Sequence, residues 1–90
     1  MTPYLVTYDL NKNKDYQTLY DELEKLNGHR TMLSVWLVPS SKNAMDFKKH
    51  LLSFMDDDDS VWVTEVTKNH AFSNAKNGTN AWLKKYPPQR

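Results

Sequence analysis

The chain has 90 residues, of which 39% are hydrophobic and 26% charged, so it is expected to form one globular domain. It contains no cysteine, which excludes a disulfide framework, a thiolate zinc site and a cysteine nucleophile, and its two glycines exclude a glycine-rich phosphate loop. The net charge of +1 excludes a strongly basic surface over the whole molecule, and because no apolar run reaches the length of a membrane span, a cytoplasmic location is expected.

The first expected element is a strand from Tyr4 to Asp9, whose apolar side chains on both parities suit a central strand covered on both faces. An amphipathic helix follows. Its apolar stripe recurs at helical spacing through Tyr16, Leu19, Tyr20, Leu23 and Leu26. Asp15 or Asn13 can cap its start, and Gly28 is placed to end it in a left-handed conformation.

Thr31 to Val38 is again rich in strand-forming residues, and Pro39 is expected to close it. A second helix follows, capped by Asn43 or Ser41. Its apolar side chains are Ala44, Phe47, Leu51, Phe54 and Met55.

The acidic run at residues 56–59 lacks the spaced ligand pattern of a calcium loop and is expected to be solvated. Residues 60–66 predict the last strand. Residues 79–85 predict a short helix capped by Thr79 or Asn80.

This order suggests an α+β, ferredoxin-like βαββαβ sandwich if the middle segment bends into two strands. Such a domain has a single antiparallel sheet with two helices on one face. We assign residues 1–67 to this core and residues 68–90 to a basic C-terminal extension that belongs to the same domain or to a dimer interface. The other face of the sheet needs a cover, for which Trp36, Trp62, the aromatic residues of the extension and a partner subunit are candidates.

Charge is distributed unevenly along the chain. Residues 1–65 carry seven basic and eleven acidic side chains, whereas residues 66–90 carry five basic side chains and no acidic one. The five are Lys68, Lys76, Lys84, Lys85 and Arg90. Such an extension can meet phosphates, meet the acidic face of a second copy, or serve solubility alone.

Tryptophan and histidine supply the remaining candidates. Trp36, Trp62 and Trp82 could stack nucleobases, or they could belong to the core or a dimer interface. The three histidines are not spaced as a ligand set, and His70 is the one that we would test as a proton carrier, against a structural role.

Taken in order, the segments "YLVTYDL", "LSVWLV" and "DDSVWVTEV", with the two helices between them, resemble the CRISPR-associated protein 2 family of small spacer-acquisition proteins. The related virulence-associated protein D toxins share this pattern. The resemblance covers residues 4–66, and "WLK" in residues 79–85 is similar to a short bacterial group labelled SinR-like.

The resemblance implies a ferredoxin-like homodimer in which Asp9 faces its twin across the dimer axis and the pair binds one magnesium ion. It further implies a metal-dependent nuclease acting on RNA or duplex DNA, or a non-catalytic scaffold that binds nucleic acid or protein. A toxin or defence component is a third reading. Members of the family usually carry several arginines where this chain has Lys12 and Lys14, which we take with Lys84 and Lys85 as the candidate nucleic-acid contacts.

Asp9 is therefore the central candidate, both as catalytic residue and as metal ligand. Magnesium prefers one or two carboxylates together with water and substrate phosphates, which two copies of Asp9 would supply. The alternative is a turn role beside Asn11 and Asn13, because aspartate often bonds its own backbone in turns.

Overall fold

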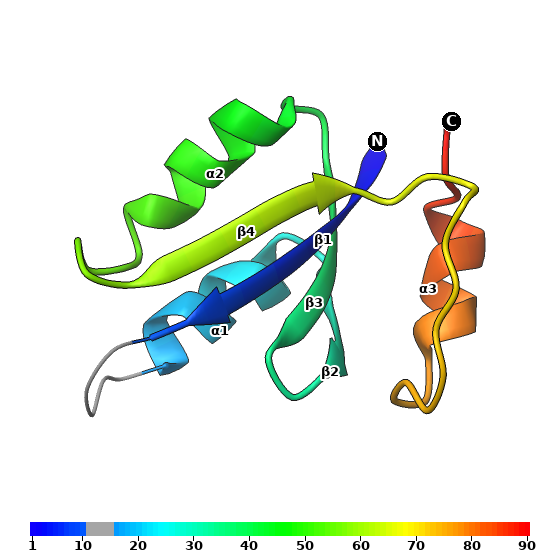
Figure 1. Ribbon diagram of the computed structural model, residues 1–90, viewed down its shortest axis with the longest axis horizontal. Coiled ribbons are helices and arrows are strands. Elements are labelled where there is room, and N and C mark those ends of the chain that lie inside the picture. Colours follow the sequence, from blue (N-terminus) through cyan, green and yellow to red (C-terminus); the bar gives the residue numbers. More distant parts are fainter. Residues whose placement is uncertain (11–15) are drawn as a thin grey trace.

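The computed structural model describes residues 1–10 and 16–90, and Figure 1 shows how their helices and strands are arranged. In chain order the elements are β1 (Thr2–Asp9), α1 (Gln17–Lys25), β2 (His29–Met32), β3 (Val35–Ser40), α2 (Ala44–Leu52), β4 (Ser60–Glu65) and α3 (Thr79–Lys85). None of the helices within these described ranges combines the length and the apolar character needed to cross a membrane.

The strands form one antiparallel sheet in the order β2-β3-β1-β4. β1 is central, with Leu5 opposite Leu37 on β3 and opposite Thr64 on β4. Helices α1 and α2 connect β1 to β2 and β3 to β4 and pack on the same side of the sheet (Figure 1). The order and the packing confirm the predicted ferredoxin-like fold.

The main core lies between the sheet and these two helices. Alternate side chains of β1, those of Tyr4, Val6 and Tyr8, are at most 4% exposed and point toward the helices. The rest of the buried cluster comes from Leu19, Leu23, Trp36, Val38, Phe47 and Leu51. Trp36 belongs to this core, so the expectation that it covers the other face was wrong.

The other face, here called the second face, is partly covered by the C-terminal extension. Trp82 of α3 packs with Leu37 and Val66 in a second apolar cluster, and its indole N–H donates to the carbonyl of Asn27 at 2.9 Å. Beyond α3, the Thr2 hydroxyl donates to the side-chain oxygen of Gln89 at 3.0 Å, which places the chain end beside the start of β1.

A pair of buried hydroxyls joins α3 to β2. The Oγ1 atoms of Thr31 and Thr79 are 2.6 Å apart, and Nε2 of His29 lies 3.2 Å from the Thr79 hydroxyl. The Thr79 hydroxyl also donates to the carbonyl of Lys76 at 2.7 Å. Thr79 therefore docks the helix and does not cap it, and the capping position falls to Gly78, whose φ of 96° is disfavoured for residues with a side chain.

Of the other local predictions, one is confirmed and one was wrong. Asn43 caps α2 as predicted, accepting the Asp46 amide at 2.8 Å. The left-handed residue after α1 is Asn27, with φ 65°, and the prediction of Gly28 was wrong. Gly28 serves a close approach instead, because a Cβ there would lie 2.6 Å from the Leu23 carbonyl oxygen.

Two further boundaries differ from the prediction. β3 continues through Pro39, which pairs with Pro3, so this proline does not close the strand. Proline is tolerated in the ladder here because each ring stands opposite the other and neither amide is required. The predicted caps Asp15 and Asn13 lie outside the described residues.

Candidate metal and nucleic-acid site

Asp9 is the last residue of β1 and lies on the second face. Because side chains alternate along a strand, the burial of Tyr8 among the helices sends Thr7 and Asp9 to the opposite side. Asp9 stands opposite Ser60, the first residue of β4. A shallow hollow of about 200 Å³ lies at this corner of the sheet, lined by Thr7, Tyr8, Asp9, Ser60, Val61 and Trp62.

The Asp9 carboxylate faces solvent. Within residues 1–10 and 16–90, no hydrogen bond or ion pair engages it. A carboxylate that is exposed and not committed to a neighbouring cation can accept a metal ion with its water shell. One chain offers a single carboxylate in this hollow, so the two-carboxylate site expected from the resemblance needs a second donor from another molecule.

Tyr8, the neighbour of Asp9, has a structural role. Its hydroxyl accepts the indole N–H of Trp36 at 3.3 Å, and its ring lies 6.0 Å from that of Tyr20 and 6.3 Å from that of Tyr16. Burial, and secondarily the hydrogen bond with Tyr20, raises the pKa of Tyr8 far above its ordinary value. The phenol therefore stays neutral at physiological pH, and it anchors the end of β1 while Asp9 points away.

The acidic run lies next to this corner, since β4 begins directly after it. Carboxylate oxygens of Asp56, Asp58 and Asp59 lie within 4.8 Å of one another, and the Asp56 amide donates to Oδ2 of Asp59 at 2.8 Å. Together with Asp9 these residues make one end of the sheet strongly acidic. Such a potential attracts a divalent cation and repels a bare phosphate, so nucleic acid would approach this corner only with cations present.

Lys84 and Lys85, the two candidate lysines that the structure describes, lie away from Asp9 within one chain. Lys84 and Lys85 are exposed in the last turn of α3, and Nζ of Lys85 lies 5.6 Å from the centre of the Tyr86 ring. The segment after them reaches the start of β1, and β1 is about 23 Å long at 3.3 Å per residue. Asp9 is at the other end of that strand. Lys12 and Lys14 lie outside the described residues.

The three tryptophans have different environments. Trp36 is 3% exposed and Trp82 is 9% exposed, so both belong to the protein interior. Trp62 is 71% exposed and lies on the second face, opposite Thr7. It is the one tryptophan whose ring is open to a nucleobase or to another protein surface.

The histidines His50 and His70 also have different environments. Nε2 of His50 lies 2.6 Å from Oε2 of Glu22, whose side chain is only 9% exposed, so this pair connects α2 to α1. The spacing of the histidines in the sequence gave no sign of this partner. His70 is exposed, its Nδ1 lies 2.6 Å from the Thr67 carbonyl, and it is not among the residues that line the hollow of Asp9.

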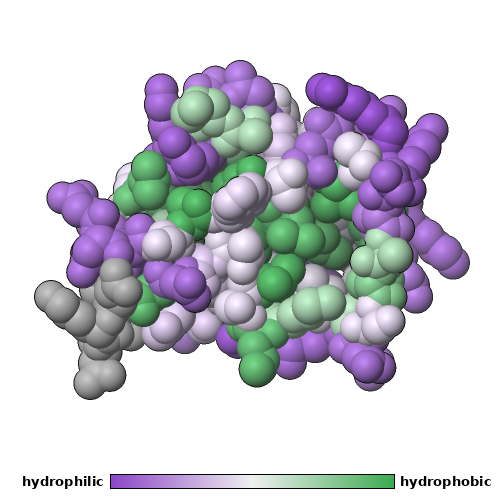
Figure 2. All heavy atoms as spheres, in the orientation of Figure 1, coloured by the Kyte–Doolittle hydropathy of each residue, from purple (hydrophilic) through white to green (hydrophobic). Residues whose placement is uncertain are grey.

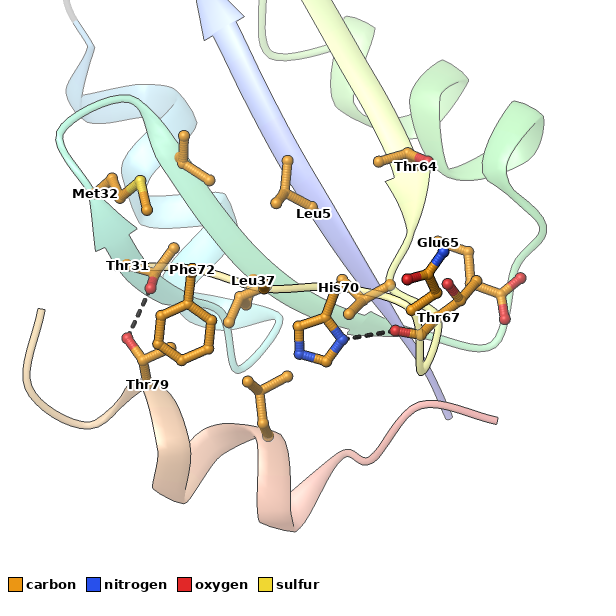
Figure 3. Close-up of a pocket in the computed structure, with 15 residues that line it drawn as sticks. Leu5, Thr31, Met32, Leu37, Thr64, Glu65, Thr67, His70, Phe72 and Thr79 are labelled. Carbon is orange, nitrogen blue, oxygen red and sulfur yellow. Dashed lines mark hydrogen bonds between the residues drawn. The ribbon is translucent and has the colours of Figure 1, made fainter. Parts of the chain in front are cut away.

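An apolar groove on the second face was not predicted from the sequence. It has a volume of about 270 Å³ and lies between the sheet and the C-terminal extension, as the close-up in Figure 3 shows. Leu5 and Leu37 come from the sheet, and Phe72 and Leu83 come from the extension. Figure 2 shows hydrophobic side chains gathered over the middle of the visible face, within a hydrophilic margin.

Comparison with known proteins gave two findings. A sequence model of the family described as CRISPR associated protein Cas2 matches residues 1–73. Among solved structures, the chain is similar to hypothetical protein TT1823 from Thermus thermophilus, with 19% sequence identity and a TM-score of 0.64. That likeness covers 83% of this chain and 94% of the other, and at this identity it shows the fold alone.

Proposed function

Because this chain belongs to the family of CRISPR-associated protein Cas2, whose members act in CRISPR-associated nucleic-acid processing and generally as dimers, we propose that it is a homodimeric, magnesium-dependent phosphodiesterase. Asp9 of each copy holds the metal ion. The substrate is RNA or duplex DNA.

The observation that supports this proposal is the position of Asp9. Its carboxylate is exposed, has no partner among the described residues and stands at the rim of a sheet face that α1 and α2 leave open. When two copies associate through this face, their β1 strands approach one another and supply two carboxylates. That number matches the protein ligands that magnesium commonly uses, with water and substrate phosphate completing the octahedron.

The residues of this chain then have distinct roles. The paired Asp9 carboxylates hold the ion, and the chemistry it supplies when bound is polarisation of a phosphoryl oxygen and activation of a water molecule. Lys12 and Lys14 follow β1 in the chain and neutralise the strand to be cleaved. Lys84 and Lys85, which lie away from Asp9 in the same chain, hold more distant phosphates.

A cleavage assay tests this function. Single-stranded RNA, structured RNA and duplex DNA are each incubated with wild type, Asp9→Asn and Glu24→Gln, with magnesium and with a chelator. Glu24 is an exposed carboxylate on α1 and serves as the matched control. We expect cleavage that requires magnesium, falls at least about 100-fold in Asp9→Asn and persists in Glu24→Gln. Cleavage that survives Asp9→Asn contradicts the assignment.

A non-catalytic nucleic-acid-binding scaffold is the second candidate, and the charge distribution favours it. The C-terminal quarter carries five basic side chains and no acidic one, and Asp9 is the only carboxylate that lines its hollow within the described residues. A scaffold would bind without cleaving, and its affinity would fall steeply with salt as counterions are released from phosphates. The double variant Lys84→Gln/Lys85→Gln would reduce that salt slope, whereas Asp9→Asn would not.

A further inference from the structure

Trp62 is an unusual residue to leave uncovered. It is 71% exposed in the middle of β4, on the second face, opposite Thr7 of β1. A tryptophan side chain can bury roughly 150–250 Å² of surface, and tryptophan is enriched among the residues that dominate binding energy at protein interfaces. Its position therefore marks it as an anchor for an occupant of this face.

The apolar groove lies on the same face. Leu5 and Leu37 of the sheet and Leu83 of α3 line it, and the ring of Phe72 stacks on that of His70 with only 4° between their planes (Figure 3). Its volume of about 270 Å³ lies near the lower end of the roughly 300–1,000 Å³ of ligand sites. It suits a single large apolar side chain.

We propose that Trp62 of each copy inserts into the apolar groove of the other copy, so that a second copy of this chain is the occupant of the second face. An isologous dimer requires a self-complementary surface, and an exposed ring and an apolar groove on one face meet that requirement. The inference rests on the dimer of the proposed function, and it adds which residues join the two copies.

The sheet order supports this arrangement. β4 carries Trp62, and the groove extends from Thr64 of that strand across Leu5 of β1 to Leu37 of β3. A two-fold axis midway between the ring and the groove therefore passes close to β1. Asp9 ends that same strand, so the contact that seats Trp62 also brings the two Asp9 residues to the same interface.

The C-terminal extension supplies one wall of the groove. α3 spans residues 79–85, beyond residues 1–73 that the family model matches, and its Leu83 forms part of the groove wall. The Thr31–Thr79 hydroxyl pair at 2.6 Å fixes that wall to β2. Without α3 the groove would lose this side.

Sedimentation equilibrium measures the effect of each side of the contact. We expect Trp62→Ala and Phe72→Ala each to raise the dimer dissociation constant, by about 30-fold or more for Trp62→Ala. Leu33→Ala is the matched control, because Leu33 is 76% exposed and does not line the groove. An equal effect of Leu33→Ala, or a dimer unaffected by Trp62→Ala, overturns the proposal.

Cysteine cross-linking tests the pairing directly, since the chain has no native cysteine. A mixture of Trp62→Cys and Phe72→Cys proteins should give the mixed disulfide in preference to either symmetric one. Trp62→Cys that cross-links chiefly to itself shows a different register and overturns this inference. In that case, disulfide-linked homodimers of Asp9→Cys would show that the two Asp9 residues still meet, and the proposed metal site would stand. Failure of this inference and failure of the proposed function are therefore distinguishable.

Trp62 fluorescence quenched by an oligonucleotide, with the protein monomeric, would assign the ring to nucleobases and also overturn the inference.

Discussion

Asp9 and Tyr8 are neighbours in the chain, but they face opposite sides of the sheet and their chemistry differs accordingly. Tyr8 is 4% exposed and is held by Trp36 and Tyr20, whereas Asp9 is exposed and has no partner among the described residues. Strand alternation alone produces this difference. A rigid tyrosine behind the strand fixes the position from which the aspartate reaches solvent.

Tyr8 makes stability sensitive to alkaline pH. Its pKa is raised above the ordinary 10.0, chiefly by burial, so the folded state keeps a proton that the unfolded state loses above pH 10. Stability is therefore fully present below pH 10 and falls as the pH rises, by up to about 1.4 kcal/mol per pH unit for one group. Urea unfolding between pH 9 and pH 11.5 should show this decline, and Tyr8→Phe should make it shallower. An identical slope in both proteins would contradict this role.

Individual residues also show where sequence reasoning fails. The periodicity of α1 predicts the helix correctly, but the left-handed conformation at its end belongs to Asn27 and not to the predicted Gly28. Both residue types tolerate positive φ, so composition could not choose between them. The real need for Gly28 is the nearby Leu23 carbonyl, a contact that depends on how the chain turns back toward β2.

At the scale of elements, helices α1 and α2 are joined by a contact that the sequence did not reveal. Glu22 is 8% exposed, and its carboxylate lies 2.6 Å from Nε2 of His50. Both residues stand beside the apolar stripes of their helices, and their meeting depends on the packing of the two helices across the sheet. A buried acid without a partner is costly, so the histidine matters more for stability than its half-exposed position suggests.

Loss of this pair should weaken the packing of the helices. We expect His50→Ala to reduce the free energy of unfolding by about 1–3 kcal/mol, because it leaves the Glu22 carboxylate desolvated and unbonded. The double variant His50→Ala/Glu22→Gln should recover part of that loss. Lys49→Ala, an exposed neighbour on α2, serves as the control in the same urea titrations. Equal effects of His50→Ala and Lys49→Ala would show that the Glu22–His50 pair adds nothing to the free energy of unfolding.

The strands and α3 illustrate what a pattern can and cannot predict. The order of strands and helices was enough to predict the ferredoxin-like topology, which the sheet order confirms. The docking of α3 through Thr31, Thr79 and Trp82 could not be predicted, because it joins residues about 50 positions apart. The groove that results is a tertiary feature without a local sequence signal.

For the whole molecule, the distribution of charge and of apolar surface favours association through the second face. The core between sheet and helices is closed, whereas the second face keeps an exposed tryptophan and an apolar groove. A chain of 90 residues buries a modest fraction of its surface alone, roughly 60–65%, so pairing two such faces would add substantially to its stability. In the proposed dimer, the acidic corner and the basic extension would form separate regions for a cation and for phosphates.

The central claim is that two Asp9 carboxylates share one magnesium ion, and the stoichiometry of metal binding tests it most directly. Titration of the dimer with Mn²⁺, followed by electron paramagnetic resonance, should give one tight site per two chains. That site should vanish in Asp9→Asn while sedimentation still shows a dimer. The competing acidic group at residues 56–59 would give one site per chain instead. One ion per chain, or binding unchanged by Asp9→Asn, would contradict the account.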